Sequence, residues 1–325
     1  MFVNIDETFF IKEKITQKKL QECILFISNQ TNIKKLVIKN AYKNYNLKKF
    51  NFPKELNKKD IDIVIKTKFN KDFKYINLDK SKIASKINRK TKSTLKKINY
   101  FQLNKVKFFP DTYLLKKIVF QNLAKGKVYL PNDLSEFSSH LLRSVASVVN
   151  NLSLQNNSEI KISSYLIHNK FDLKVDNLNH KIINIFIKFL KKHPKDRINL
   201  SLTHGDFKFG HLFLIKRKLE YVVDWENVGV RSIFFDLMNF FLPWFERRLY
   251  NYSQIKEYIL NFIDNYLPFL KNNINNKYDI YFSIYALERY IRIKEARTSK
   301  FDIDEAYKRY NFLFKKLYYG INKKI

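Results

Sequence analysis

The feature that most constrains the fold is a change of residue pattern about one third of the way along the chain. Before it, short stretches rich in β-branched and aromatic residues predict strands at 35–39, 61–67, 73–78 and 113–120. Between these stretches, residues 81–100 predict a lysine-rich helix through an incomplete apolar stripe. The first part of the chain therefore predicts a mixed, strand-rich region.

Helical spacing dominates after a predicted linker at 121–127. Asp133 and Glu136 have the spacing of a capping box at the start of the first of these helices. The helical segments, in chain order, are 133–152, 181–193, 233–249, 252–270, 276–298 and 303–318. Short strands are expected between Leu200 and Val223. A strand-rich part, a connector and a helix-rich part predict a two-lobed α+β protein.

The formal net charge of +32 predicts attraction to polyanions such as nucleic acid, anionic lipid headgroups or phosphorylated glycans. The lysines are spread along the whole chain together with many Asn and Ile residues, a pattern typical of compositional drift. The chain contains no arginine-rich arm and no set of zinc ligands, so a dedicated nucleic-acid module is not favoured.

Cys23 is the single cysteine, so no disulfide can form within the chain, which fits a reducing compartment. The first residues lack the basic and apolar regions of a signal peptide. No apolar stretch reaches the roughly 18 residues that span a bilayer. We expect a cytoplasmic protein that can be peripheral to the inner face of a membrane through its charge.

The residues with the clearest chemical meaning lie at 201–240, where a loop containing His204 and Asp206 sits between apolar strand segments. A second acid, Asp224, follows another predicted strand, and a hairpin would bring both carboxylates to one end of the sheet. Two such carboxylates suit phosphoryl transfer, in which one carboxylate accepts the proton of the attacking hydroxyl and the other holds Mg²⁺. Lys208 can neutralise charge on the transferred group.

This stretch resembles the aminoglycoside phosphotransferase and choline kinase family, whose loop reads H-G-D-x-x-x-x-N. His204, Gly205 and Asp206 match the loop, and Asp224-Trp225-Glu226 matches the metal-binding segment. Asp236-Leu237 matches a downstream pair, and we expect Asp236 to brace the backbone of the loop. The resemblance implies a bilobal protein-kinase-like fold, with a nucleotide-side lobe at 1–118, a hinge at 119–127 and a helical catalytic lobe at 128–325. It also implies ATP and Mg²⁺ as cofactors.

His211 stands where the family has a metal-binding asparagine. Imidazole nitrogen is a poor Mg²⁺ ligand, so one interpretation is a weakened or lost metal site, and Mn²⁺ is a second candidate ion. The loop also resembles that of lipopolysaccharide core heptose kinases, which carry H-x-D-x-x-x-x-H-F. That resemblance implies that His211 is compatible with activity and points to an envelope glycan as substrate.

The first lobe matches the kinase-like pattern less well. The expected nucleotide-binding lysine falls at Asn77, and no glutamate lies between Lys80 and Tyr100 to pair with it. Lys66, Lys68 and Lys74 are alternatives. No glycine precedes Gly126, so a glycine-rich phosphate loop is missing. The predicted hinge residues that contact adenine are Phe120, Gln121 and Asn122.

Two function hypotheses follow from these observations. The first is a kinase that transfers the γ-phosphoryl group of ATP to a hydroxyl of a small molecule or sugar, with Asp206 and Lys208 as catalytic residues and His211 and Asp224 as metal ligands. The second is a pseudokinase, a binding or scaffold module in which the nucleotide site has degenerated. Nucleic acid binding rests on the net charge alone.

Overall fold

The computed structural model describes residues 1–325 except 7, 32, 45, 54–55, 67–72, 87–107, 116–117, 125–126, 129–138, 156, 170–180, 217, 249, 297–306, 309, 311–313 and 315–325. The chain forms two compact units. Unit 1 consists of residues 1–132 and 209–226, and unit 2 consists of residues 133–208 and 227–325.

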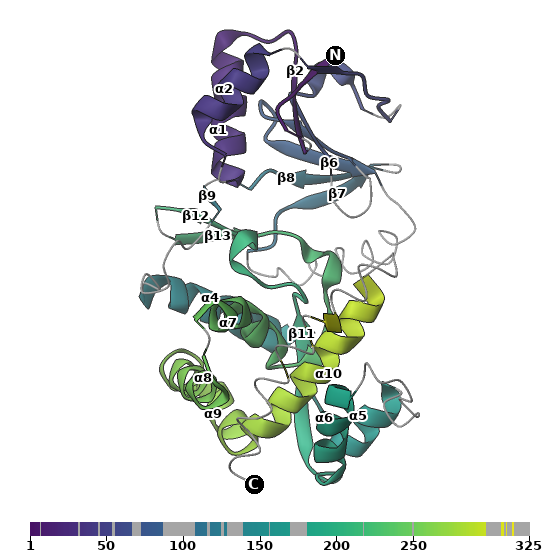
Figure 1. Cartoon of the computed structure of the whole chain (residues 1–325), viewed down its shortest axis with the longest axis vertical. Coiled ribbons are helices and arrows are strands. Elements are labelled where there is room, and N and C mark those ends of the chain that lie inside the picture. The colour runs from purple at the N-terminus through teal and green to yellow at the C-terminus, as the bar shows by residue number, and fades with distance from the viewer. Residues whose placement is uncertain are drawn as a thin grey trace. The chain divides into compact units, whose positions relative to one another are not determined.

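Unit 1 is built on an eight-stranded antiparallel sheet (Figure 1). Its strands, in chain order, are β1 (Phe2–Asn4), β2 (Phe9–Lys12), β3 (Leu47–Lys48), β4 (Ile63–Lys66), β5 (Phe73–Asn77), β6 (Lys82–Lys86), β7 (Thr112–Leu115) and β8 (Ile118–Asn122). Their order across the sheet is β3-β1-β2-β4-β5-β6-β8-β7. The strands predicted at 61–67 and 73–78 are confirmed as β4 and β5.

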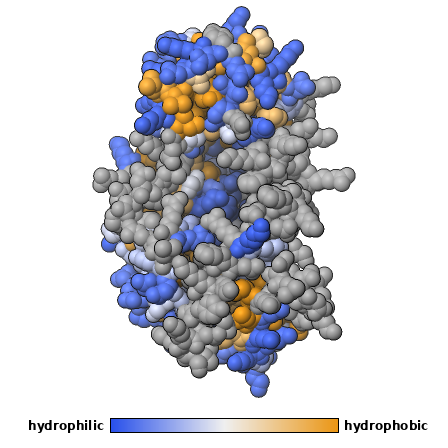
Figure 2. Space-filling model, in the orientation of Figure 1, coloured by the Kyte–Doolittle hydropathy of each residue, from blue (hydrophilic) through white to orange (hydrophobic). Residues whose placement is uncertain are grey.

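The two faces of this sheet bury different side chains because neighbouring residues of a strand point in opposite directions. On β4, Ile63 packs with helices α1 (Gln17–Gln30) and α2 (Lys35–Lys43), whereas Val64 packs on the other face with an aromatic cluster. That cluster includes Phe2, Phe10, Phe50, Phe52, Phe73, Tyr75 and Phe120. Space-filling shows apolar side chains at the surface over α1 and α2 as well (Figure 2).

Two predictions for unit 1 are wrong in the described residues. Residues 35–39, predicted as a strand, form the start of α2, because Ile38, Ala41 and Tyr42 recur at helical spacing and pack toward the sheet. The helix predicted at 81–100 begins instead as strand β6, which pairs with β5 and β8. The rest of that predicted helix, from residue 87 on, lies outside the described residues.

A second, three-stranded sheet of unit 1 contains β9 (Lys127–Val128), β12 (Leu212–Ile215) and β13 (Lys218–Val222). β12 pairs with β13 as a hairpin and with β9 on its other side. This pairing places residues 209–226 in unit 1, whereas the sequence assigned them to the helical lobe. The division into 1–118, 119–127 and 128–325 stays a prediction, and the contacts depart from it at this hairpin.

Unit 2 is mainly helical, as predicted for this part of the chain (Figure 1). Its helices are α4 (Ser139–Gln155), α5 (Ile162–His168), α6 (Lys181–Lys191), α7 (Phe235–Arg248), α8 (Tyr252–Tyr266), α9 (Pro268–Ile274) and α10 (Tyr278–Ala296). The segment predicted as one helix at 252–270 is divided, because Pro268 lacks an N–H and starts a new helix. Residues 133–138 of the helix predicted at 133–152 lie outside the described residues, and so does most of the helix predicted at 303–318.

A small antiparallel sheet in unit 2 joins β10 (Ser158–Lys161), β11 (Arg197–Thr203) and β14 (Gly229–Ser232). Short 3₁₀ turns complete the elements of both units, at Lys58–Asp60, Phe209–His211, Trp225–Asn227 and Asn275–Lys277. The aromatic run Phe234, Phe235, Phe240 and Phe241 is fully buried in unit 2. Trp225 is buried in unit 1 beside Phe109.

No helix among the described residues has the length and apolar content needed to span a membrane.

The single thiol of the chain provides a test of the α1 packing. Cys23 is fully buried on α1, and burial raises the pKa of its thiol to about 12. Because the thiolate is the reactive form, we expect the native protein to resist alkylation by N-ethylmaleimide and the unfolded protein to react once. Mass spectrometry of both samples checks this expectation, and rapid labelling of the native protein would contradict the packing of α1 on the sheet.

Candidate active site

The predicted catalytic loop begins where β11 ends in unit 2. The Thr203 hydroxyl donates to the Gly229 carbonyl over 2.8 Å, which ties the end of β11 to β14. Gly205 follows with φ +81°, a conformation that favours glycine. A Cβ atom at this position would lie 2.1 Å from the Asn227 carbonyl oxygen. The loop therefore needs glycine both for its backbone conformation and for its close approach to residue 227.

Asp236 holds the backbone of the loop from the first turn of α7. Its carboxylate accepts the N–H of His204 at 2.5 Å and the N–H of Gly205 at 2.9 Å. Burial raises the pKa of Asp236, while His204, the two N–H groups and Arg231 favour its charged form. The sequence predicted that Asp236 braces this loop, and its hydrogen bonds confirm that role.

Asp206 and Lys208 lie together on the loop. The Lys208 ammonium donates to Asp206 Oδ2 over 2.7 Å, and the Asp206 side chain is 30% exposed. The Asp206 N–H donates to Nδ1 of the fully buried His204 over 3.3 Å, so a neutral His204 carries its proton on Nε2. The arrangement presents one carboxylate and one ammonium to solvent on a backbone that buried groups hold in place.

His211 and Asp224 meet in unit 1, at the end of the β12–β13 hairpin. The Val223 N–H donates to the His211 carbonyl over 3.0 Å, which extends the hairpin ladder to this point. His211 Nε2 then lies 3.4 Å from Asp224 Oδ2. The backbone of Asp224 has φ +71°, a strained conformation for a residue with a side chain. Strain of this kind is concentrated at functional sites, where the surrounding structure enforces it.

The structure thus forms two pairs, Asp206 with Lys208 in unit 2 and His211 with Asp224 in unit 1. The predicted hairpin is present, but it joins β12 to β13, whereas β11 pairs with β10 and β14. Convergence of Asp206 and Asp224 on one cation stays a prediction, because the two residues belong to different units.

The predicted hinge residues Phe120, Gln121 and Asn122 lie in β8. β8 pairs with β6 on one side and with β7 on the other, so Phe120 and Gln121 have partners in both ladders. The Asn122 side chain accepts from Lys82 and donates to Asp111. These pairings place the three residues inside the sheet of unit 1, and their contact with adenine stays a prediction.

The position expected to carry the nucleotide-binding lysine has a structural role in unit 1. Asn77 is buried at the end of β5, and its Oδ1 accepts the Lys80 N–H over 2.7 Å, which holds the turn to β6. The strand after this turn carries Lys82 and Lys86. Neither lysine is among the nucleotide-binding candidates from the sequence, because the sequence pattern predicts a helix at 81–100.

Two further polar residues near the loop were missed from the sequence. Arg231 on β14 donates to the Thr203 hydroxyl over 2.8 Å and lies over the Phe235 ring. Glu288 on α10 is fully buried, and its carboxylate accepts the Ser232 N–H and hydroxyl, each at 2.6 Å. A charged residue directly after the largely apolar run 280–287 was the available signal for Glu288.

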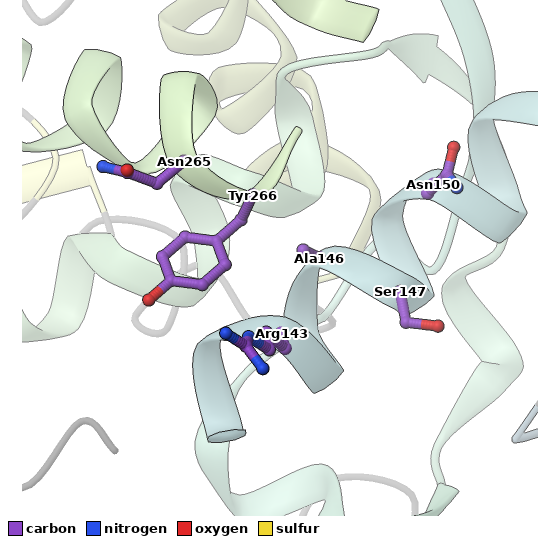
Figure 3. Close-up of a pocket in the computed structure, with 6 residues that line it drawn as sticks. All are labelled: Arg143, Ala146, Ser147, Asn150, Asn265 and Tyr266. Atoms are coloured by element: carbon purple, nitrogen blue, oxygen red, sulfur yellow. The ribbon is translucent and has the colours of Figure 1, made fainter. Parts of the chain in front are cut away.

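A surface cavity of about 290 Å³ lies elsewhere in unit 2, between α4 and α8 (Figure 3). The α4 side contributes Arg143, Ala146, Ser147 and Asn150, and the α8 side contributes Asn265 and Tyr266. None of the residues predicted for the active site lines this cavity. It is therefore separate from the catalytic loop.

Comparisons with known proteins identify the fold. An aminoglycoside 2'-phosphotransferase-IIIa in its GDP complex aligns with a TM-score of 0.53 and 11% identity over 75% of this chain and 89% of that chain. A Ralstonia eutropha protein named as an aminoglycoside phosphotransferase aligns with a TM-score of 0.51 and 10% identity over 80% and 92% of the two chains. The amicoumacin kinase hAmiN, in complex with AMP-PNP, Ca²⁺ and Ami, aligns with a TM-score of 0.50 and 10% identity over 90% and 96%.

The chain therefore has the protein-kinase-like fold of the aminoglycoside phosphotransferases, which confirms the predicted fold class. Within that fold, residues 162–266 match the model of the phosphotransferase enzyme family. The matched segment contains His204, Asp206, His211, Asp224 and Asp236. No curated protein matches the chain. The resemblance of the loop histidine to heptose kinases stays a prediction.

Proposed function

We infer that the chain is a phosphotransferase that moves the γ-phosphoryl group of ATP to a hydroxyl of a small molecule or sugar. The observation that carries this proposal is the loop geometry of unit 2, in which Asp236 fixes the two peptide N–H groups before Asp206. The carboxylate of Asp206 remains partly exposed on this fixed loop. The match of residues 162–266 to a phosphotransferase family supports the same conclusion.

Each residue of the loop has a role that its contacts support. Asp206 orients the acceptor hydroxyl and accepts its proton, because a positioned carboxylate is the usual base in this chemistry. Lys208, 2.7 Å from that carboxylate, offsets the negative charge of the transferred group. Asp236 and His204 are positioning residues, since they bind the loop backbone within the protein.

The proposed ligands of a divalent cation are Asp206 of unit 2 and the His211–Asp224 pair of unit 1. Two carboxylates and one imidazole suit a divalent ion, and the nitrogen donor favours Mn²⁺ relative to an all-oxygen site. When bound, such an ion neutralises charge on the phosphate oxygens. The proposal requires Asp206 of unit 2 to join the His211–Asp224 pair of unit 1 in holding that ion.

Replacing His211 with asparagine tests the choice of ion. Asparagine supplies an oxygen donor, so we expect the ratio of Mn²⁺ affinity to Mg²⁺ affinity to fall by about tenfold or more. Competition titrations of the two ions against the purified protein measure this ratio without reference to turnover. An unchanged ratio in His211→Asn would show that His211 is not a ligand.

The function itself is tested with purified protein, Mg²⁺ or Mn²⁺, and a panel of acceptors. The panel contains aminoglycosides, choline, simple sugars and envelope glycans, and both ATP and GTP are supplied as donors. Phosphorylated product, identified by mass spectrometry, is the expected result for one acceptor class. The basic charge of the chain leads us to expect an anionic or phosphorylated glycan among the accepted substrates.

The pseudokinase alternative makes the opposite prediction for the same protein. Thermal melting at increasing concentrations of nucleotide and divalent ion separates the phosphotransferase from the pseudokinase. A ligand that binds the folded state raises Tm further as the ligand concentration increases. A concentration-dependent increase in Tm would argue against a degenerated nucleotide site, and a phosphorylated product would exclude the pseudokinase. An absence of both effects would remove the phosphotransferase assignment.

A further inference from the structure

The surface formed by α1 and α2 in unit 1 combines large exposed apolar side chains with lysines. Leu25 on α1 is 45% exposed, and Leu36 and Val37 on α2 are 67% and 53% exposed. In the space-filling view, an apolar area over α1 and α2 is surrounded by hydrophilic side chains (Figure 2). Apolar side chains gathered in this way, rather than scattered singly, indicate an interaction surface.

The charge on this surface has one sign. Its exposed lysines are Lys18, Lys34, Lys35, Lys39 and Lys43. The sequence contains no acidic residue between Glu22 and Glu55, and Glu22 itself is paired with Lys19 at 3.2 Å. None of the ion pairs found among the described residues of unit 1 involves these five lysines. Compositional drift explains many lysines, but it does not explain their combination with exposed Leu and Val.

Packing of unit 1 does not require this surface. The side chains that α1 and α2 bury against the sheet are Cys23, Ile24, Ile27 and Ile38. Leu25, Leu36 and Val37 lie outside that buried cluster. Substitution of the exposed residues is therefore expected to preserve the fold, and the surface is available to a partner.

The composition of the surface identifies the kind of partner. Protein interfaces are depleted of lysine at their cores and enriched in arginine and aromatic residues, which these exposed positions lack. Nucleic acid phosphates would accept the lysines but would leave the three apolar side chains without a partner. An anionic bilayer surface accommodates both, because lysines bind the headgroups and apolar side chains enter the acyl boundary.

We propose that α1 and α2 form a docking surface for a bilayer containing anionic phospholipids. Lys34, Lys35 and Lys39 lie within three residues of Leu36 and Val37 in the sequence. Contact with the headgroups and insertion of the apolar side chains therefore involve the same end of α2. The binding is peripheral and reversible, and it is independent of the catalytic loop of unit 2.

Flotation of the full chain with vesicles tests this proposal. Vesicles of phosphatidylcholine are compared with vesicles that also contain phosphatidylglycerol, at low and at physiological salt. We expect binding only to the anionic vesicles, with a decrease as salt is raised. The affinity of the Lys35→Gln/Lys39→Gln variant for anionic vesicles is expected to fall by at least about 10-fold. Leu36→Asn/Val37→Asn is expected to weaken binding at both salt concentrations.

Matched controls make the same chemical changes in unit 2. Lys191→Gln/Lys192→Gln removes two exposed lysines, and Leu154→Asn removes a leucine that is 72% exposed. Both controls are expected to bind vesicles like the unaltered protein. Equal losses in the controls and the α2 variants would overturn the proposal, since net charge alone would then explain binding.

Two other outcomes would also overturn the proposal. One is equal binding to vesicles without phosphatidylglycerol. The other is absence of vesicle binding together with oligonucleotide binding that the α2 variants abolish, which would assign the surface to nucleic acid. Asp206→Asn is expected to float with vesicles like the unaltered protein, because vesicle binding does not depend on catalysis. Failure of the proposed function would therefore not affect the test of the docking surface.

Discussion

Replacing Asp206 with asparagine is expected to lower kcat by about 10²- to 10⁴-fold, the usual contribution of a positioned general base. Asparagine has nearly the same shape, so the Asp206 N–H can keep its 3.3 Å bond to His204 Nδ1. Asp236 still binds the N–H groups of His204 and Gly205. The loss is therefore expected in turnover and not in Tm, and steady-state kinetics with thermal melting measure both.

The matched control for this prediction is Asp264→Asn. Asp264 is an acid of unit 2 that is 38% exposed and paired with Lys271 at 3.4 Å. The control is expected to turn over substrate at the normal rate. Unchanged turnover in Asp206→Asn would remove this residue from catalysis, and an equal loss in Asp264→Asn would attribute the effect to charge alone.

Loss of the Glu288 carboxylate is expected to produce the largest effect on stability. Its Oε2 accepts the Ser232 hydroxyl at 2.6 Å, and its Oε1 accepts the Ser232 N–H at 2.6 Å and the Tyr165 hydroxyl at 3.1 Å. Glu288→Ala leaves these buried donors without an acceptor and opens a cavity. We expect a decrease of about 3–5 kcal/mol in the free energy of unfolding, measured by urea denaturation.

Glu288→Gln separates hydrogen bonding from charge. The glutamine amide oxygen, placed where Oε1 lies, still accepts the Ser232 N–H and the Tyr165 hydroxyl, and its NH₂ group can donate to the Ser232 hydroxyl. We expect this variant to lose much less stability than Glu288→Ala. Equal losses in the two variants would contradict a role for these hydrogen bonds.

The titration of Glu288 also predicts how the stability of the protein depends on pH. Burial raises the pKa of Glu288 from 4.5 to about 7, against hydrogen bonds and Arg231 that favour the charged form. Because the folded protein binds this proton more tightly than the unfolded chain, its stabilising contribution is complete below pH 4.5 and declines as the pH rises through about 7. The contribution is on the order of 3 kcal/mol and should be absent from Glu288→Gln. A constant difference between the unaltered protein and this variant across that range would contradict the predicted titration.

Sequence periodicity was sufficient for most of unit 2 and for two strands of unit 1. The helices predicted at 181–193 and 233–249 are confirmed as α6 and α7, because their apolar residues recur at helical spacing. Pro194 follows α6 closely. The pattern failed at α2, where the short run Lys35–Lys39 is compatible with either period. The pattern failed again at β6. These five residues form a strand because they pair with β5 and β8, and a local sequence pattern carries no information about such pairing.

The loop was predictable because Gly205, Asp206 and Asp236 match a family motif at the spacing of that motif. The contacts of Asp236 confirm its predicted role. Glu288 and Arg231 were not predicted because neither belongs to that motif, and Glu288 meets Tyr165 across 123 residues of sequence. Such pairs are specified by tertiary packing, and only the folded arrangement of α5, β14 and α10 brings them together.

Binding of Mn²⁺, followed by electron paramagnetic resonance with and without ADP, tests the central claim most directly. We predict one tight site in the unaltered protein and at least about tenfold weaker binding in both Asp206→Asn and Asp224→Asn, because the proposed site requires both carboxylates. Asp264→Asn should bind like the unaltered protein. Unchanged Mn²⁺ affinity in either Asp206→Asn or Asp224→Asn would contradict a site shared by the two carboxylates.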